Sequence, residues 1–208
     1  MKKLLTVIFA SLLALALVLP AEAVGRTELS EAQRARLDTF FSNFAEAHVE
    51  SFVVNNELPL ETFVNFGIQH NLINRHYDLV NVDVNNCGVK KEAVEAAVYK
   101  YFGHRINAVS TKQYKLKNNV FIAPKAGGEA IRFAQVSEWK SAGNGAWYGT
   151  VNIYSASSGF TGNVHGNAAE WKKDDPQDVP VIVERYSFTV TRSPADANRY
   201  VLREWLKQ

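Results

Sequence analysis

Residues 129–155, EAIRFAQVSEWKSAGNGAWYGTVNIYS, decide the fold of this chain. Large apolar residues occupy mostly alternate positions on both sides of residues 141–145, where small and turn-forming residues interrupt the pattern. Alternation with a period of two places side chains on one face of a strand. The residues that carry it here are Ile131, Phe133, Trp139, Trp147, Val151 and Ile153. We therefore predict a long β-hairpin in the middle of a sheet, with an apolar layer over one face.

The chain on either side of this hairpin, after Gly103, also has the pattern of antiparallel strands. Residues 114–117 and 120–123 flank Asn118-Asn119, which predicts a tight hairpin. Two further strands are predicted at residues 181–191 and 200–206, joined by a turn-rich segment. The apolar phase shifts within the first of these strands, so we expect a β-bulge near Glu184 and Arg185.

Helical periodicity is confined to the residues before Gly103. The capping-box sequence Ser30-Glu31-Ala32-Gln33 begins a helix predicted over residues 31–48, with a stripe of phenylalanines facing the core. A second helix is predicted to start with Pro59 in its first turn, and a third to run from about residue 90 to Gly103. Residues 77–84 suggest a short strand or link that residues 85–88 interrupt.

Helices followed by antiparallel strands indicate an α+β domain, with the N-terminal helices packed on a curved antiparallel β-sheet. This order of elements resembles the cone-shaped NTF2-like superfamily, which is cystatin-like in outline. The resemblance spans most of residues 29–208 and implies a curved sheet wrapped against helices, with a pocket open at one end. Members of that superfamily include enzymes, ligand binders and scaffold modules, so the resemblance leaves the function open.

The N-terminus has the pattern of a cleavable signal peptide. Lys2 and Lys3 precede an uncharged, largely apolar run, and Ala21-Glu22-Ala23 matches the small-x-small cleavage pattern. Cleavage after Ala23 would leave residues 24–208 as a single secreted or periplasmic domain with no stable membrane anchor. The alternative is an uncleaved N-terminal anchor helix. The apolar run of about 16 residues is shorter than the roughly 20 residues that a membrane-spanning helix needs.

Composition narrows the classes of function. The whole chain has a formal charge of +2, and its lysines and arginines form no cluster interleaved with aromatic residues, so we expect no nucleic-acid partner. Cys87 is the only cysteine, which excludes an internal disulfide. It is either a reactive or intermolecular thiol or a small apolar residue in a loop, and we favour the second because no histidine partner can be assigned to it.

Residues 157–180 form the longest predicted connection between strands. Their composition is rich in Gly, Ser, Asn and Asp, yet Phe160 and Trp171 lie within them. Long polar loops are often lids or binding loops. The loop is therefore a flap over the pocket or a partner-binding loop, or else a mobile insertion whose two rings pack against the sheet.

Residues with catalytic chemistry are few and follow no known motif. The candidates are His70 and His104 as bases, with Glu138, Asp78 or Glu184 as carboxylate partners and Tyr148 or Tyr114 to polarise a substrate. His48 and His70 both fall on the apolar side of predicted helices, where a histidine is usually part of the core. Metal-ligand spacing, nucleotide-binding loops and nucleophile motifs are absent, so we predict no metal and no cofactor.

Two hypotheses of function follow from this sequence. The favoured one is a non-catalytic binding module for a small apolar ligand or a partner protein, with Trp139, Trp147, Tyr154, Phe160 and Trp171 as candidate binding residues. The alternative is a small hydrolase or isomerase that uses a pocket histidine with a carboxylate. Self-association as a homodimer through an exposed sheet face is a further possibility.

Overall fold

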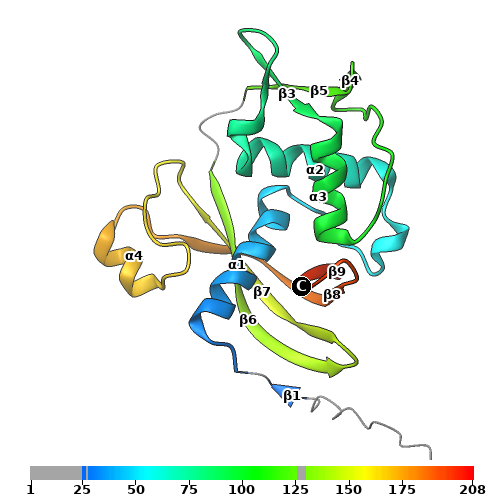
Figure 1. Cartoon of the computed structure of the whole chain (residues 1–208). Coiled ribbons are helices and arrows are strands. Elements are labelled where there is room, and N and C mark those ends of the chain that lie inside the picture. The colour runs from blue at the N-terminus through cyan, green and yellow to red at the C-terminus, as the bar shows by residue number, and fades with distance from the viewer. Residues whose placement is uncertain (1–24, 27, 126–129) are drawn as a thin grey trace, which may run out of the picture.

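The computed structural model describes residues 25–26, 28–125 and 130–208, and the predicted signal peptide lies outside these residues. The described elements follow one another from blue to red in Figure 1. They are β1 (Gly25–Arg26), α1 (Glu31–Glu46), α2 (Leu60–Asn74), β2 (Val80–Asn81), β3 (Asn86–Lys90), α3 (Lys91–Phe102), β4 (Lys115–Lys117), β5 (Val120–Pro124), β6 (Ile131–Gly143), β7 (Ala146–Ala156), α4 (Ala168–Asp174), β8 (Val181–Ser193) and β9 (Asp196–Lys207), with short 3-10 turns at Asn55–Glu57 and His76–Asp78.

The large sheet is antiparallel, with the strand order β1-β6-β7-β8-β9, and confirms the central hairpin. Asn144 and Gly145 form the tip of that hairpin with φ angles of 53° and 72°, which is the left-handed geometry of a tight two-residue turn. Both long hairpins have shorter turns than the sequence predicts. Only Pro194 and Ala195 separate β8 from β9, because the turn-rich residues around them extend the two strands.

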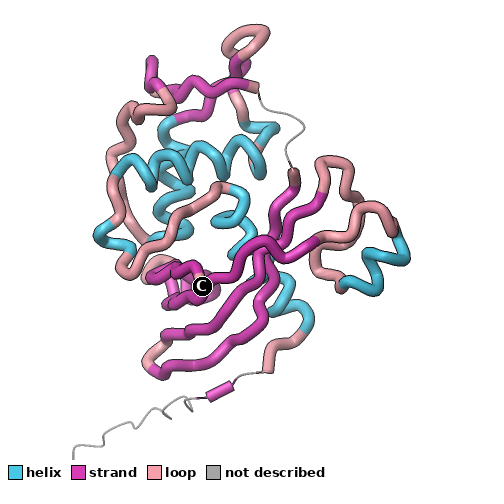
Figure 2. The backbone as a smooth tube through the Cα atoms, turned by 180° about the vertical axis from the view of Figure 1, so that it is seen from behind, coloured by secondary structure: helices cyan, strands magenta, loops and turns pink. Residues whose placement is uncertain are grey.

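A β-bulge interrupts β8 close to the predicted position. Ile153 of β7 pairs with Glu184, whereas the next residue, Tyr154, pairs with Ile182, so Val183 is the extra residue. Further register shifts follow Val136 in β6 and Thr189 in β8. Bulges bend strands, and Figure 2 shows the long strands curving along their length.

The single sheet expected from the sequence is wrong, because β2, β3, β5 and β4 form a second antiparallel sheet in that order. Residues 85–88 were expected to interrupt a strand, but β3 begins at Asn86 and pairs with β5. The turn lies just before it, where the Asp83 carboxylate accepts hydrogen bonds from the backbone N–H groups of Asn85 and Asn86. Cys87 is consequently a buried strand residue with a free thiol rather than a loop residue.

Local capping signals set the ends of the helices. The Ser30 capping box is formed as predicted, and α3 ends at Gly103 with a left-handed φ of 73°. Pro59 precedes α2 directly as its N-cap residue. The first helix ends at Glu46 and not at His48, which is exposed with a positive φ of 49°, so its placement on an apolar helix face is wrong.

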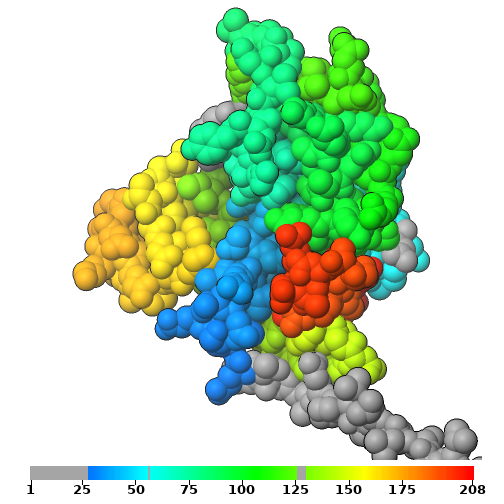
Figure 3. All heavy atoms as spheres, in the orientation of Figure 1, coloured from blue at the N-terminus to red at the C-terminus, as the bar shows by residue number. Residues whose placement is uncertain are grey.

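The helices α2 and α3 separate two apolar cores. Phe66 and Phe102 belong to the core over the large sheet, and Val64 and Val94 belong to the core under the small one. The buried residues of α2 divide between the two cores on different sides of that helix, whereas those of α3 form one stripe that contacts the small-sheet core at Val94 and the large-sheet core at Phe102. In Figure 3 the C-terminal hairpin, in red, fills the space between α1 and the green helical part of the chain.

A ladder of polar side chains on α1 covers the edge of β6. Ser42 accepts a hydrogen bond from Ala134 N–H at 2.9 Å, Asp38 accepts one from Val136 N–H at 2.7 Å, and Arg34 donates to the Val136 carbonyl at 2.7 Å. Their spacing of four residues places all three on one face of the helix. This ladder protects a strand edge that would otherwise be open to pairing with another chain.

A close backbone approach makes Gly149 hard to replace. A Cβ atom at this position would lie 1.9 Å from the Glu138 carbonyl oxygen and 3.0 Å from the Phe188 ring. Because a backbone oxygen cannot rotate aside, Gly149→Ala is expected to lower the free energy of unfolding by about 1–3 kcal/mol in urea denaturation. Gly159→Ala is the control, since the nearest atom that a Cβ there would meet is the flexible Ser157 hydroxyl at 3.5 Å. Equal losses in the two variants would contradict the proposed clash.

Candidate functional site

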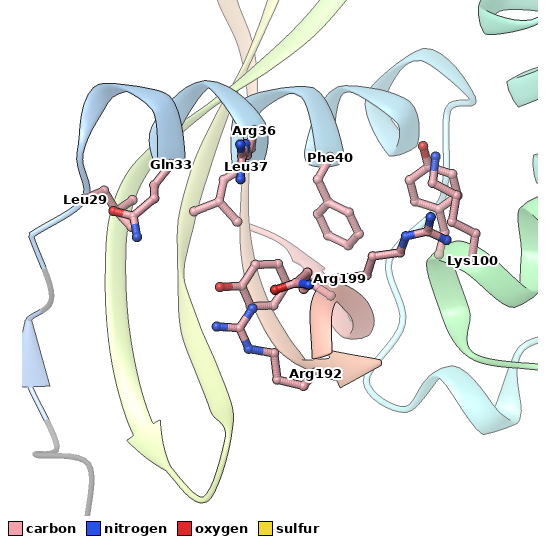
Figure 4. Close-up of a pocket in the computed structure, with 11 residues that line it drawn as sticks. Leu29, Gln33, Arg36, Leu37, Phe40, Lys100, Arg192 and Arg199 are labelled. Carbon is pink, nitrogen blue, oxygen red and sulfur yellow. The ribbon is translucent and has the colours of Figure 1, made fainter. Parts of the chain in front are cut away.

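A surface cavity of about 320 Å³ lies between α1, the end of α3 and the tip of the β8–β9 hairpin. Figure 4 shows Leu37 and Phe40 pointing from α1 toward the hairpin, which carries Arg192 and Arg199 on the opposite side. The eleven lining residues are Leu29, Gln33, Arg36, Leu37, Phe40, Lys100, Tyr101, Arg192, Asn198, Arg199 and Tyr200. Three elements that are distant in sequence thus meet around one space.

Local structure explains which side chains reach this cavity. Gln33, Leu37 and Phe40 are spaced by four and three residues, so they project from one face of α1. The two-residue turn brings Arg192 directly opposite Tyr200 in the paired strands. Lys100 and Tyr101 lie in the last turn of α3, where a lysine also interacts favourably with the helix dipole.

Aromatic rings form the floor of the cavity. The Phe40 ring centroid lies 5.8 Å from that of Tyr101 and 6.4 Å from that of Tyr200. Behind Tyr200, Trp139 and Trp147 each contact its ring edge-on at 5.4 Å. These rings fix one another in place, so the floor is a rigid apolar surface.

The walls of the cavity are cationic. Arg36, Lys100, Arg192 and Arg199 line it, and none of the eleven lining residues is acidic. The Arg192 guanidinium carbon lies 4.5 Å from the Tyr200 ring centroid and 4.7 Å from that of Trp147. Such stacking holds an arginine in place while its N–H groups stay available to a ligand.

Burial is the main cause of the pKa shifts of two lining residues, and the shift of Lys100 also reflects neighbouring positive charges. Burial lowers the pKa of Lys100, and the nearby charges of Arg199 and Arg75 lower it further. Burial, followed by the charge of Glu46, raises the pKa of Tyr101 to about 12, so its phenol is neutral at physiological pH. An anion entering the cavity would relieve the repulsion between Lys100 and Arg199.

The structure does not assemble the predicted acid–base set. His70 is buried in α2 against Phe66 and Tyr101, and the charges that act on its pKa are those of Lys100 and Arg75. The charge acting on the pKa of His104 is that of Arg203. Burial is the first cause that lowers the pKa of both histidines, and no carboxylate of the residues that the structure describes is among the charges that act on either.

The other catalytic candidates lie in separate parts of the fold. Glu138 pairs with Lys140 at 2.9 Å on β6, and Tyr148 is an exposed residue opposite Lys140 on β7. Asp78 pairs with Arg75 at the surface, Glu184 contacts Arg132 and Lys207, and Tyr114 accepts a hydrogen bond from Gln69 in the smaller core.

The five candidate binding residues fall into two groups, and neither lines the cavity. Trp139 and Trp147 stack behind its floor at 6.0 Å. Tyr154, Phe160 and Trp171 cluster with Phe133 on the other face of β6 and β7, with centroid distances between 5.2 and 6.5 Å. In this second group, Phe160 and Trp171 pack the 157–180 segment against Phe133 and Tyr154 of the sheet.

The 157–180 segment contains the helix α4, which the sequence interpretation missed. Asn167 caps this helix, and Glu170 completes the capping box. The Trp171 side chain is 2% exposed and donates a hydrogen bond from its indole N–H to the Asn163 carbonyl at 2.7 Å. The capping pattern in the sequence that could have predicted this helix start is Asn167-Ala168-Ala169-Glu170. The helix itself has only seven residues, which are too few to show a helical periodicity.

Two other hollows are lined by charges of both signs, and a third, of about 360 Å³ beside Cys87, has Lys125 as its only lining lysine or arginine among the described residues, against four in this cavity. One of about 1020 Å³ between the end of α1 and α2 is lined by Glu46, Glu50, Glu61 and Lys112, among others. The other, of about 240 Å³, contains the ion pairs that Glu184 forms with Arg132 and Lys207. Within residues 25–26, 28–125 and 130–208, no group of three or more His, Cys, Asp or Glu side chains is arranged to hold a metal ion.

The fold and the site together define an α+β protein with two antiparallel sheets and a cationic, ring-lined cavity. No protein-family model, curated protein or solved structure matches this chain. None of the helices in the described ranges combines the length and apolarity needed to span a membrane.

Proposed function

We propose that this protein is a binding module for a small organic anion with an apolar body, held in the cavity between α1, α3 and the β8–β9 hairpin. The observation that carries this proposal is the combination of four cationic side chains with an aromatic floor and no acidic lining residue. It refines the hypothesis of a small apolar ligand by adding a negative charge. The candidate catalytic residues lie elsewhere, so the proposal includes no chemical step.

The size and physical character of the cavity support this proposal. Its volume of about 320 Å³ lies at the lower end of the roughly 300–1,000 Å³ found for small-molecule sites. The floor of Leu37, Phe40 and Tyr200 offers an apolar body dispersion contacts and removal from water. Arg192 is already stacked on two rings, so binding costs little additional side-chain entropy.

Export and family membership form part of the same proposal. The Lys2-Lys3 start, the apolar run and the Ala21-Glu22-Ala23 pattern support a cleavable signal and a secreted or periplasmic protein. The order of helices and antiparallel strands supports a distant relation to NTF2-like cones, in which a pocket lies between helices and a curved sheet. Such a binder would meet its ligand outside the cytoplasm.

Binding of anilinonaphthalene sulfonate, a fluorescent aromatic anion, tests this proposal. We expect saturable binding with a stoichiometry of one, and about tenfold weaker binding to Arg192→Gln, because one charge-assisted contact is lost at a partly exposed site. Arg185→Gln is the matched control. It removes the same charge from the same strand, but Arg185 is bonded to Asn152 outside the cavity.

Two further measurements make the outcome decisive. Phenylnaphthylamine, which has the same rings without the sulfonate, should bind more weakly than the anion to the unchanged protein. Raising the salt concentration should weaken the anion more than the neutral probe, because salt screens the charges. The proposal fails if Arg192→Gln and Arg185→Gln bind the anion equally well, or if the unchanged protein does not bind it.

A further inference from the structure

Three of the four cations of the cavity, all except Arg36 of α1, are divided between two ends of its aromatic floor. Lys100 and Arg199 form one end, and Arg192 forms the other. From this division we infer that the ligand carries two anionic groups, one at each end of an apolar body. The inference rests on the proposed function and specifies the ligand class as an elongated dianion, such as an α,ω-dicarboxylate.

The first end joins a helix terminus to the tip of the hairpin. The Lys100 ammonium lies 4.7 Å from the centroid of the Tyr101 ring, and Figure 4 shows the Arg199 side chain extending toward Lys100. After burial, the charge of Arg199 is the largest cause of the lowered pKa of Lys100. Asp196 pairs with Arg199 at 3.0 Å on an exposed surface, whereas Lys100 forms no ion pair in the described part of the chain. This end therefore retains an unbalanced positive charge.

The second end is built around a single arginine. Arg192 lies over Trp147 and Tyr200, on the side of the cavity away from Lys100. It forms no ion pair within the ranges that the structure describes, and it is not among the charges that shift the pKa of Lys100. Arginine in this stacked geometry presents its planar edge, which matches the two oxygens of a carboxylate.

A row of rings separates the two ends. Lys100 lies over the Tyr101 ring, and Arg192 lies over the Tyr200 ring. The Phe40 ring lies between these two tyrosines, with centroid distances of 5.8 Å to Tyr101 and 6.4 Å to Tyr200. One small anionic group bound at either end leaves the cation at the other end unpaired. A ligand with an apolar middle and two charged ends satisfies both cations and covers the Phe40 ring at the same time.

Calorimetric titration of the purified protein with two homologous series tests this inference. The probes are straight-chain α,ω-dicarboxylates and the monocarboxylates of the same chain lengths. We expect the affinity of the dicarboxylates to pass through a maximum at one chain length, where the dicarboxylate binds about tenfold tighter than its monocarboxylate. Monocarboxylate affinity should rise steadily with length, because each added methylene buries more apolar surface.

Three variants locate the two ends. Arg192→Gln and Lys100→Gln should each abolish the tighter binding of the best dicarboxylate over its monocarboxylate. The double variant should lose no further preference for the dicarboxylate, because either single substitution already removes one of the two anion-binding ends. Arg185→Gln should preserve the advantage, and thermal melts of all variants report on folding. Equal affinities of the two series at every length would overturn the inference while the proposed function stands. Absence of binding by anilinonaphthalene sulfonate would overturn the proposed function itself.

Discussion

Trp205→Ala is expected to lower the free energy of unfolding by about 3–5 kcal/mol, the range for removing a large aromatic side chain from a packed core. Trp205 is 1% exposed, stacks on Tyr186 at 4.3 Å and lies 5.9 Å from Phe41. Its indole N–H donates to the Val49 carbonyl at 3.2 Å, and its backbone pairs with Phe52. One side chain thus joins β9 to β8, α1 and the segment after α1.

Trp171→Ala is the matched control, because its indole is buried to almost the same extent. Trp171 packs Phe133, Tyr154 and Phe160 together on the other face of the sheet, so its loss frees the 157–180 segment without opening the main core. In urea denaturation, Trp205→Ala should shift the global transition strongly, and Trp171→Ala should shift it less. A shift of equal size in both variants would show that the two clusters unfold as one unit.

Acid destabilisation centred on His70 is the second large effect that we expect. Burial, followed by the charges of Lys100 and Arg75, lowers the pKa of His70 from 6.5 to about 4. As the pH falls below 6.5, the unfolded chain binds a proton at His70 while the folded chain does not. The free energy of unfolding therefore falls as the pH falls toward 4, by about 3 kcal/mol in total for this shift.

His70→Phe should remove this part of the pH dependence. Phenylalanine keeps the ring that packs against Phe66 and Tyr101 but cannot be protonated. Urea midpoints measured between neutral pH and pH 4 should fall less for the variant than for the unchanged protein. His76→Asn, which removes an exposed imidazole, should leave the slope of the unchanged protein intact. An unaltered slope in His70→Phe would place the acid sensitivity elsewhere.

The sequence predicts best what neighbouring residues determine. The capping box at Ser30, the left-handed end of α3 at Gly103 and the paired asparagines at residues 118 and 119 were all found as expected. The bulge in β8 also lies beside its predicted position. Each of these features depends on backbone preferences and hydrogen bonds within a few residues.

The errors arose where long-range packing changes the meaning of a local pattern. Asn85-Asn86-Cys87-Gly88 has turn-forming residues, but Asp83 caps the turn earlier and leaves β3 to pair with β5. Sequence patterns also did not say which surface each large ring would cover. Trp139 and Trp147 pack behind the cavity floor, and Trp171 packs on the opposite face of the sheet, which was one of the two alternatives for the 157–180 segment.

By itself, the sequence determined the α+β class, the central hairpin and most helix and strand ends, because periodicity and capping act over short distances. Only the tertiary structure decided that the strands form two sheets and that α2 and α3 separate two cores. It also decided the site, because Arg36, Lys100 and Arg192 belong to three segments with no shared motif. Their charges become one binding surface only where folding brings α1, α3 and the last hairpin together.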